Sequence, residues 1–444
     1  MADSLAELRS LASHDDPYNL PVADLEPLWI DAIDRRFGEC RSQIRVLDQL
    51  AERAGVDAIR RLEDVVPLLF AHTAYKSYPE AFIRRDRWDR MNLWLDTLSK
   101  NRVEGVDLAD ISDADVWLER LHAAGHPVFT TSGTSGKHSF INQSAVDVAF
   151  SNQIMMPAGV EPDRSRPLFV LGPRRAPNRA SAFFSHLADT CGRPDAIYFL
   201  TDEVLRITDL SKMVSMRRQI AEGSAAPSEI AGFEQAMKAR AERSEKLMGR
   251  MIEAIIDHRE EASIIVGLTP QLFSVVQVAR ERGLPDGCFH PETVVVSGGG
   301  AKGFDLPEDH VEQIMRFMGL GLDRFTQGYG MQEVSTGGRM LEWGRYRFPG
   351  WIVPLVLDDS GEQLLNPREG TVSGRMAIFD TSIDGRWGGI ISGDRVVVDF
   401  SPSPSGRPGP TVLEIARYSE LEGGDDKLTC AGTIDSFVRG AIGE

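Results

Sequence analysis

The sequence predicts an α/β protein in which helices cover parallel sheet layers and an antiparallel β subdomain follows. Three observations support this fold class. Up to about residue 125, apolar residues recur at helical spacing. From His126, short β-rich runs alternate with helical stretches. After about Trp343, turns rich in Gly, Pro and Asp separate short apolar runs.

The N-terminal section is predicted to be mostly helical. Apolar residues three and four positions apart occur in Leu28 to Phe37, Ile44 to Arg53, Ala58 to Leu69 and Asp107 to Leu121. Within the last stretch, Asp113 is a candidate N-cap because its carboxylate can accept from free backbone N–H groups.

The central section is predicted to contain buried parallel strands. The candidates are Pro167 to Leu171, Ala196 to Leu200, Ser263 to Val266 and Thr293 to Val296. Their nearly continuous β-branched and aromatic composition is typical of strands covered on both faces. A long polar helix is expected from Glu229 to Glu260.

The C-terminal section is predicted to be antiparallel. Its strand candidates are Trp351 to Val353, Leu355 to Leu357, Gly374 to Ile378, Val396 to Phe400 and Thr411 to Ile415. The Ser- and Pro-rich segment Ser401 to Pro410 is expected to be an exposed loop.

Composition restricts the classes of function. The chain has 444 residues and a net charge of −17, which argues against general nucleic-acid binding and against attachment to anionic lipid. Its four cysteines form no CxxC pair, so neither a disulfide scaffold nor a zinc site is expected. The N-terminus lacks the basic and apolar regions of a signal peptide, and Pro270 interrupts the most apolar stretch. We therefore expect a cytoplasmic protein with no membrane or nucleic-acid partner.

The run Thr130 to Lys137 is a candidate phosphate loop. Glycines let backbone N–H groups turn toward one anion, hydroxyls add further donors, and Lys137 adds a point charge. It is not a Walker A loop, because Thr131 stands where the first glycine belongs, and Lys137 excludes a hydrolase elbow. The alternative is a flexible linker. Its position after a strand-like run and before a possible helix favours the phosphate loop.

Two later segments each supply a carboxylate. Glu333 follows the Gly-Tyr-Gly sequence at 328–330, and Asp394 follows Ser392-Gly393 on what is expected to be a tight turn before a strand. A loop for phosphates, an acid for a metal and an acid for a ribose would form an ATP site. Alternatively, Glu333 is a solvated loop acid, Asp394 a turn former and Tyr329 a core residue.

A rival motif lies at Gly298 to Gly303, which satisfies GxGxxG after a strand-like run. In a dinucleotide fold, the last glycine should lie in the first helical turn and an acid should end the next strand. Here Asp305 and Pro307 are expected to begin the helix after the glycines, and the strand near Arg324 to Thr326 leads into Gln-Gly-Tyr-Gly. NAD(P)-dependent oxidoreduction therefore remains an alternative with weak support.

In this order, the motifs resemble those of the adenylate-forming superfamily of acyl-CoA synthetases. The segment 131–136 resembles its phosphate loop, Gly298 to Lys302 its adenine turn, Gly328 to Glu333 its Tyr-Gly-x-Thr-Glu motif and Ser392 to Asp394 its Thr-Gly-Asp motif. Gly432 to Asp435 with 438–440 is a faint copy of its hinge.

Three further details resemble luciferase-pathway acyl-protein synthetases, phenylacetate-CoA ligases and phenazine-tailoring adenylating enzymes. They are Tyr75 to Pro79, the Lys302 that follows the triple glycine, and Tyr346 to Trp351 before Leu357 to Glu362. The resemblance covers roughly residues 70–440. It implies a helical section over 1–125, a nucleotide- and substrate-binding core over 126–342, a β-rich subdomain over 343–432 and a hinge-like remnant over 433–444.

The sequence departs from the superfamily in two ways. Thr433 stands where the hinge arginine is expected, and the chain ends at Glu444 before the small C-terminal domain that brings a catalytic lysine. We therefore expect that domain to be lacking, which puts thioester formation in doubt. Lys137 or Lys302 is a hypothetical substitute for the missing cation.

The resemblance implies activation of a carboxylic acid by ATP and Mg²⁺, with release of pyrophosphate and transfer of the acyl group to CoA, a carrier protein or another enzyme. An aryl or medium-sized acid is expected, and a homo-oligomer is left open. The alternative outside catalysis is a degenerate nucleotide-binding or scaffolding protein.

The implied roles fall into four groups. Catalytic residues would be Thr134, Lys137, Lys302 and Glu333, with Glu333 also the metal ligand. Nucleotide-binding residues would be Thr131, Ser132, Gly133, Thr134, Ser135, Gly136, Lys137, Gly299, Gly300, Ala301, Tyr329, Gly330, Met331 and Asp394. Residues at the acyl group would be Gly298, Gly328 and His186, the last with a core histidine as alternative. Cys430 is either an acyl acceptor or a small buried residue.

Overall fold

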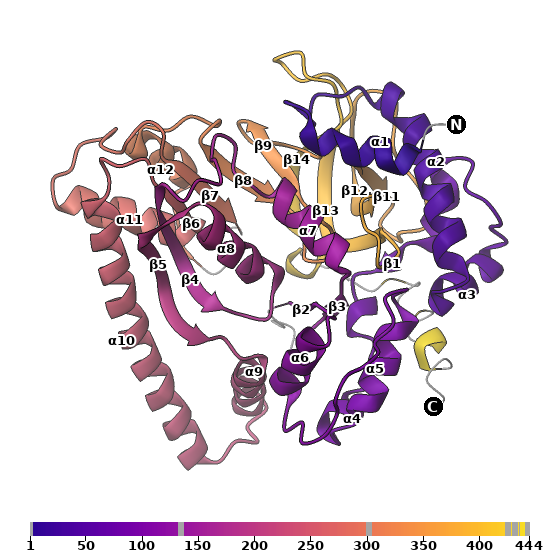
Figure 1. The fold of residues 1–444 in the computed structure, drawn as a ribbon, viewed down its shortest axis with the longest axis horizontal. Helices are drawn as coiled ribbons and strands as arrows, with labels where there is room; N and C mark the ends of the chain where they lie inside the picture. The colour runs from indigo at the N-terminus through magenta and orange to yellow at the C-terminus, as the bar shows by residue number, and fades with distance from the viewer. Residues whose placement is uncertain are drawn as a thin grey trace.

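The computed structural model describes residues 3–131, 137–298, 304–421, 428, 434 and 436–439. Within these residues, twelve strands form one long sheet and two more form a separate pair. Figure 1 shows the sheet running through the molecule, with α10, α11 and α12 at one end and the N-terminal helices at the other. The expected α/β fold class, with a parallel part and an antiparallel part, is confirmed.

The α-helices among the described residues have the following bounds: α1 Ser4–Ser10, α2 Val22–Arg41, α3 Arg45–Ala54, α4 Glu80–Arg84, α5 Trp88–Thr97, α6 Ala114–Ala123, α7 Ala145–Ile154, α8 Arg179–Thr190, α9 Ile207–Ala221, α10 Pro227–Asp257, α11 Thr269–Glu281 and α12 His310–Met318. Short 3-10 helices cover η1 Leu11–Ser13, η2 Leu62–Leu68, η3 Ala74–Lys76 and η4 Tyr418–Glu420. Residues 436–439 are also helical.

The strands have the following bounds: β1 Phe70–Ala71, β2 Val128–Thr130, β3 Phe140–Asn142, β4 Arg166–Arg175, β5 Gly192–Val204, β6 Ile264–Leu268, β7 Val294–Gly298, β8 Phe325–Tyr329, β9 Gly338–Glu342, β10 Arg345–Arg347, β11 Ile352–Leu357, β12 Thr371–Asp380, β13 Gly389–Asp399 and β14 Thr411–Arg417. The order along the long sheet is β11-β12-β13-β14-β10-β9-β8-β7-β6-β4-β5, with β1 beside β13.

The parallel part of the sheet comprises β8, β7, β6, β4 and β5. Successive side chains of a strand point to opposite faces of the sheet, so neighbouring residues of β4 pack into two different hydrophobic clusters. Phe169 packs with residues of α10, α11 and α12, whereas Val170 packs with Phe183 of α8. Burial on both faces explains the continuous apolar runs in the sequence.

The antiparallel part begins where β8 pairs with β9. The N-terminal section packs against it: β1 pairs in parallel with β13, and the indole N–H groups of Trp29 and Trp387 donate to the carbonyls of Gly350 and Leu68. The expected divisions near residues 125, 342 and 432 stay predictions.

Two local expectations were wrong. The stretch Ala58 to Leu69 was expected to be an α-helix, but it forms only the 3-10 helix η2, which contains Pro67, a residue without the N–H that an α-helix uses. Asp305 does not cap the helix after the glycines, because α12 begins at His310. Asp113 does cap α6, by accepting from the N–H groups of Asp115 and Val116.

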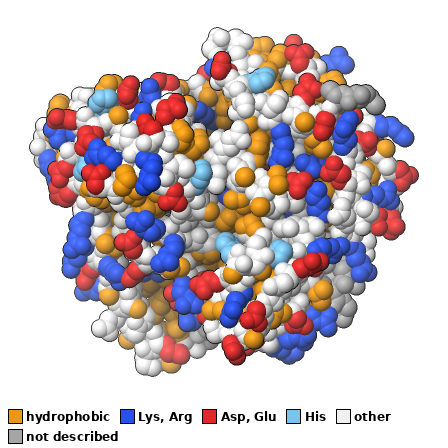
Figure 2. Space-filling model, in the orientation of Figure 1, with side chains coloured by type: hydrophobic (Ala, Val, Ile, Leu, Met, Phe, Trp, Pro, Cys, Tyr) orange, Lys and Arg blue, Asp and Glu red, His pale blue; other side chains and the backbone are white. Residues whose placement is uncertain are grey.

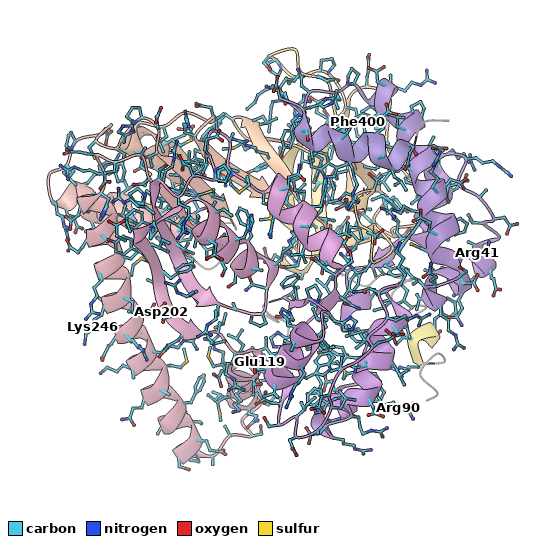
Figure 3. The ribbon with its side chains drawn as sticks, viewed as in Figure 1. Arg41, Arg90, Glu119, Asp202, Lys246 and Phe400 are labelled. Atoms are coloured by element: carbon cyan, nitrogen blue, oxygen red, sulfur yellow. The ribbon has the colours of Figure 1, made fainter. Side chains whose placement is uncertain are left out.

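The exposed charges lie on the outer helices and loops. Figure 3 shows Lys246 projecting from α10 and Glu119 from α6, and both residues are exposed. Among the described residues, no helix has the length and apolar character needed to cross a membrane.

Candidate active site

A cavity of about 800 Å³ opens along the carboxyl ends of β4, β6, β7 and β8. Its apolar wall includes Met155, Met156, Phe183, Phe184 and Leu268. Figure 2 shows hydrophobic side chains gathered in the middle of one face of the molecule, between its two halves. A volume of this size is typical of a small-molecule site.

The strand order explains why the cavity lies here. β4 has β5 on one side and β6 on the other, so the chain reverses its direction of travel across the sheet beside β4. The loops after β4 and β6 therefore diverge to opposite sides and leave a crevice, which is the usual ligand position in an open parallel sheet. Gly172 and Gly267 lie at this point and line the cavity.

The candidate phosphate loop connects two antiparallel strands. β2 pairs with β3, so the expected succession of strand, loop and helix is wrong in detail: a strand stands between the loop and α7. Before the loop, the Thr130 N–H and hydroxyl both donate to the carbonyl of Pro177, at 2.6 and 2.9 Å. The loop base is therefore fixed to the N-terminus of α8, where Asn178 and Arg179 line the cavity.

Thr131 and Lys137 are the described loop residues that were expected to bind the nucleotide, and each has a partner within the protein. The Thr131 hydroxyl accepts from the Ser139 N–H at 3.2 Å. The Lys137 ammonium donates to the carbonyl of Tyr78 and lies 4.3 Å from the centre of the Tyr78 ring. Residues 132–136 lie outside the described residues, so the roles of Ser132, Gly133, Thr134, Ser135 and Gly136 stay predictions.

Two buried arginines hold the turn that carries Glu333. Arg179 donates to the carbonyls of Met331 and Val334, and Arg386 donates to the carbonyl of Glu333 at 3.0 Å. Arg386 also donates to the Tyr75 hydroxyl at 2.9 Å, which ties the turn to η3. Burial lowers the pKa of Arg179 to about 10, so this guanidinium still carries its charge at neutral pH.

The Glu333 carboxylate is buried within this frame. Burial raises its pKa, while the charges of Arg386, His72 and Lys76 act in the opposite direction. Within the described part of the chain, no side chain donates a hydrogen bond to this carboxylate. Glu333 is therefore not the solvated loop acid that the sequence left open.

Tyr329 and Asp394 form a second buried pair. The Tyr329 hydroxyl donates to Oδ2 of Asp394 at 3.0 Å, and Arg417 forms an ion pair with Oδ1 at 2.9 Å. Burial and the nearby Asp394 charge raise the pKa of Tyr329, so its hydroxyl keeps its proton. The ring of Tyr329 packs edge-on against Phe348.

Asp394 lies inside β13, and the tight turn expected before a strand is wrong. Arg375 of β12 pairs with Arg395, whereas Ala377 pairs with Ile391, so Ser392, Gly393 and Asp394 oppose a single residue. The pairing shift is a β-bulge, a device that redirects side chains without ending the strand. It explains how a turn-like sequence continues as a strand.

The two acids and the loop base are linked through a few contacts. Glu333 follows Tyr329 by four residues, and Tyr329 binds Asp394. Arg386 connects the Glu333 turn to Tyr75, and the same N-terminal segment supplies the carbonyl that binds Lys137. The cavity lining includes Tyr329, Gly330 and Met331 of the second motif and Asn178 and Arg179 beside the loop base. Thr131, Lys137, Glu333 and Asp394 are not among the described residues that line it.

Of the three residues expected at the acyl group, two line the cavity and one does not. Gly298 and Gly328 line the cavity, at the ends of β7 and β8. His186 is half-buried on α8 and is not among the described residues that line it, whereas Phe183 and Phe184 of the same helix are. Gly299, Gly300, Ala301, Lys302 and Cys430 lie outside the described residues.

The fold has counterparts among solved structures. An open conformation of 2-hydroxyisobutyryl-CoA ligase in complex with 2-HIB-AMP and CoA superposes with a TM-score of 0.52 at 12% identity, over 92% of this chain and 78% of that one. The same ligase in the postadenylation state, in complex with R3-HIB-AMP, gives 0.50 at 12% identity, over 90% and 68%.

The chain shares the fold of this CoA ligase. No family model matches the sequence. No curated protein matches it either. The shared fold agrees with the superfamily that the ordered motifs resemble.

Sequence reasoning missed the residues that hold this site together. Tyr75 was quoted only as part of a resemblance, and Arg179 and Arg386 carried no signal at all. Their hydrogen bonds join residues 155 and 311 positions apart, which no local pattern reports. A buried arginine with backbone acceptors is recognisable only after the fold is known.

Proposed function

We propose that the protein activates a carboxylic acid by adenylation with ATP. The observation that carries this proposal is the series of contacts that links the Glu333 turn, the Tyr329–Asp394 pair and the base of the hydroxyl-rich loop, next to a cavity that Tyr329, Gly330 and Met331 line. The fold shared with a ligase bound to an acyl adenylate supports it. The acceptor of the acyl group, whether CoA, a carrier protein or another enzyme, stays open.

In the proposed reaction, a carboxylate oxygen of the acid attacks the α-phosphorus of ATP. The bond between that phosphorus and the bridging oxygen breaks, pyrophosphate leaves with the bonding electrons, and no proton is transferred. Both reactants are anions, so the site must place them in line and offset their charge. The apolar wall holds the acid, and the ends of β7 and β8 approach the nucleotide.

Asp394 would accept hydrogen bonds from the ribose hydroxyls, since each carboxylate oxygen has capacity beyond its present partner. Tyr329 would fix the orientation of Asp394 and form part of the nucleotide wall. The hydroxyls of Thr131, Ser132 and Thr134 would donate to the β- and γ-phosphates, with Lys137 and Lys302 as cations nearby.

The Glu333 carboxylate fits the needs of a magnesium ion. It is buried and receives no hydrogen bond from the described side chains. No group of three potential ligands occurs among the described His, Cys, Asp and Glu residues, and Mg²⁺ ordinarily takes one or two carboxylates plus water and substrate phosphates. Bound Mg²⁺ would offset phosphate charge, and Arg386 keeps the Glu333 backbone in place.

Exchange of labelled pyrophosphate into ATP, with a panel of carboxylic acids and Mg²⁺, tests the function. We expect exchange that depends on both the acid and the metal. NAD(P) binding without exchange would favour the oxidoreductase, although β8 ends at Tyr329 and not at an acid. The absence of exchange and of any thermal shift with Mg²⁺-ATP would favour the degenerate binding protein.

Lys137→Met and Lys302→Met test whether either lysine neutralises phosphate charge. If either lysine neutralises phosphate charge, its loss should lower adenylate formation by about 10-fold or more, as removal of one transition-state contact commonly does. Rapid-quench formation of the acyl adenylate would measure this step apart from acyl transfer. Unchanged rates in both variants would contradict the hypothesis.

A further inference from the structure

One end of the cavity carries positive charge without a matching acid. Arg339 of β9 lines the cavity and pairs across the sheet with Gly328, so its side chain lies on the same face as that of Thr326. Tyr18, from the N-terminal section, lines the same end. We call Tyr18 and Arg339 the arginine end of the cavity; Arg347 does not line it.

Arg339 and Arg347 stand directly opposite each other on β9 and β10. Directly opposed like charges destabilise a strand pair, and burial increases the cost. Arg347 is only 3% exposed, and burial lowers its pKa. Within the described part of the chain, the Nε atoms of both arginines are buried without a hydrogen-bond partner.

The two acids whose charges act on Arg347, Glu342 and Asp16, have other partners. Asp16 forms an ion pair with Arg407 at 2.7 Å and accepts from the Tyr18 N–H. Glu342 accepts from the hydroxyls of Ser403 and Ser405, both at 2.6 Å. Among the described residues, neither Arg339 nor Arg347 has an acid within ion-pair distance.

Arg179 also lines the cavity, but it is not equivalent to Arg339. Its guanidinium is occupied by the carbonyls of Met331 and Val334. Among the described residues that line the cavity, Arg339 is therefore the arginine that is available to a ligand. The Tyr18 hydroxyl is protonated at neutral pH, because burial raises its pKa although Arg339 lowers it.

We infer that the acid activated by this protein carries a second carboxylate, which Arg339 binds at the arginine end of the cavity with the Tyr18 hydroxyl as a further donor. The inference rests on the proposed adenylation. Guanidinium and carboxylate match as a two-bond pair, and such charge-assisted bonds are strong away from water. The apolar wall holds the body of the molecule between the two carboxylates.

The strand geometry limits the length of that body. The segments that follow β8 and precede β9 approach closely at Gly330 and Gly337, next to the turn that carries Glu333. Arg339 follows Gly337 by two residues, which is roughly 7 Å along a strand. With the reacting carboxylate near Gly330 and the second one at Arg339, this short spacing favours a compact body, such as one aromatic ring or a six-carbon chain.

The test compares acids that differ only in the second carboxylate. Benzoate is paired with 1,4-benzenedicarboxylate and hexanoate with hexanedioate, because each diacid is symmetrical and the activated end is unambiguous. Pyrophosphate exchange should give a kcat/KM at least about 10-fold higher for the diacid of a pair, because a hydrogen bond between charged groups contributes about 1.5–3 kcal/mol, which corresponds to about 10-fold or more.

Arg339→Met should lower kcat/KM for the diacids by about 10-fold or more and change the value for the matching monoacids by less than about 3-fold. Arg339→Lys should restore part of the preference. Arg368→Met, which changes an exposed arginine, should leave the ratio as in the wild type. The KM for ATP should not change in either Met variant.

Several outcomes would overturn the inference and leave the proposed function intact. They are equal use of both acids of each pair, a preference that survives in Arg339→Met, or exchange with other acids but with neither diacid. No exchange with any acid would instead overturn the proposed function. If Arg339→Met does not fold, Tyr18→Phe should still reduce the diacid preference by a few-fold, and an unchanged preference would contradict the inference.

Discussion

Glu333 and Asp394 are nearly equally buried, with 7% and 6% of their surface exposed, but the regions around them differ. The β13 bulge presents Asp394 to side-chain partners, so both of its oxygens are engaged by Tyr329 and Arg417. The turn that carries Glu333 is held through its carbonyls by Arg179 and Arg386, and the described side chains give its carboxylate no hydrogen bond.

The difference separates two ways of placing a buried acid. Asp394 is stabilised by the fold itself, because its charge is matched by a donor and a cation. Glu333 is positioned by its backbone, and its carboxylate receives no hydrogen bond from the described side chains although the charges of Arg386, His72 and Lys76 act on it. A buried carboxylate with so few hydrogen bonds costs free energy of folding. We therefore expect changes at Glu333 to affect activity most, and changes at Asp394 to affect activity and stability together.

The largest effect is expected for Glu333→Gln, which keeps the shape and removes the charge. If this carboxylate orients Mg²⁺, pyrophosphate exchange should fall by about 10²–10³-fold. Glu369→Gln, at an exposed position, is the matched control and should behave as the wild type. Exchange within 3-fold of the wild-type rate in Glu333→Gln would exclude the metal role.

Next in size is Arg386→Met, which leaves the Tyr75 hydroxyl and the Glu333 carbonyl without their donor. The free energy of unfolding should fall by about 1.5–3 kcal/mol, the usual contribution of a charged hydrogen bond. Urea unfolding measures this loss, and Arg368→Met is the control. A stable Arg386→Met variant with normal exchange would show that the turn does not depend on this contact.

A smaller effect is expected for Asp394→Asn, because Tyr329 can still donate to the amide oxygen. Loss of the charge should raise the KM for ATP by about 10-fold, as expected when one charged hydrogen bond to a ligand is weakened. The kcat should change little. Asp202→Asn, at a side chain 83% exposed, is the control. An unchanged KM for ATP would mean that Asp394 is structural only.

The same two regions show how much of the structure could be predicted from the sequence. The strands, the Asp113 cap and the identity of both acids followed from apolar runs, capping chemistry and ordered motifs. The bulge in β13 did not, because Ser-Gly-Asp has the composition of a turn and its extended path depends on the pairing of β13 with β12 and β14. The opposition of Arg339 and Arg347 likewise depends on strand register, which the sequence leaves open.

The smallest expected effect concerns stability against pH. Burial raises the pKa of Glu333 above its ordinary value, so the folded state holds this proton to higher pH than the unfolded chain does. Stability of the wild type should therefore fall as the pH rises from the ordinary glutamate pKa through the raised one. Glu333→Gln has no such proton to lose.

The two proteins should accordingly be similar in stability in acid, and Glu333→Gln should be the more stable one once Glu333 is ionised. Urea unfolding across this pH range, without nucleotide or metal, would measure the difference. Mg²⁺ with ATP should then stabilise the wild type more than the variant, because a ligand that binds only the folded state adds to its stability. A Glu333→Gln protein that is less stable than the wild type at neutral pH would mean that the carboxylate already has a partner within the fold.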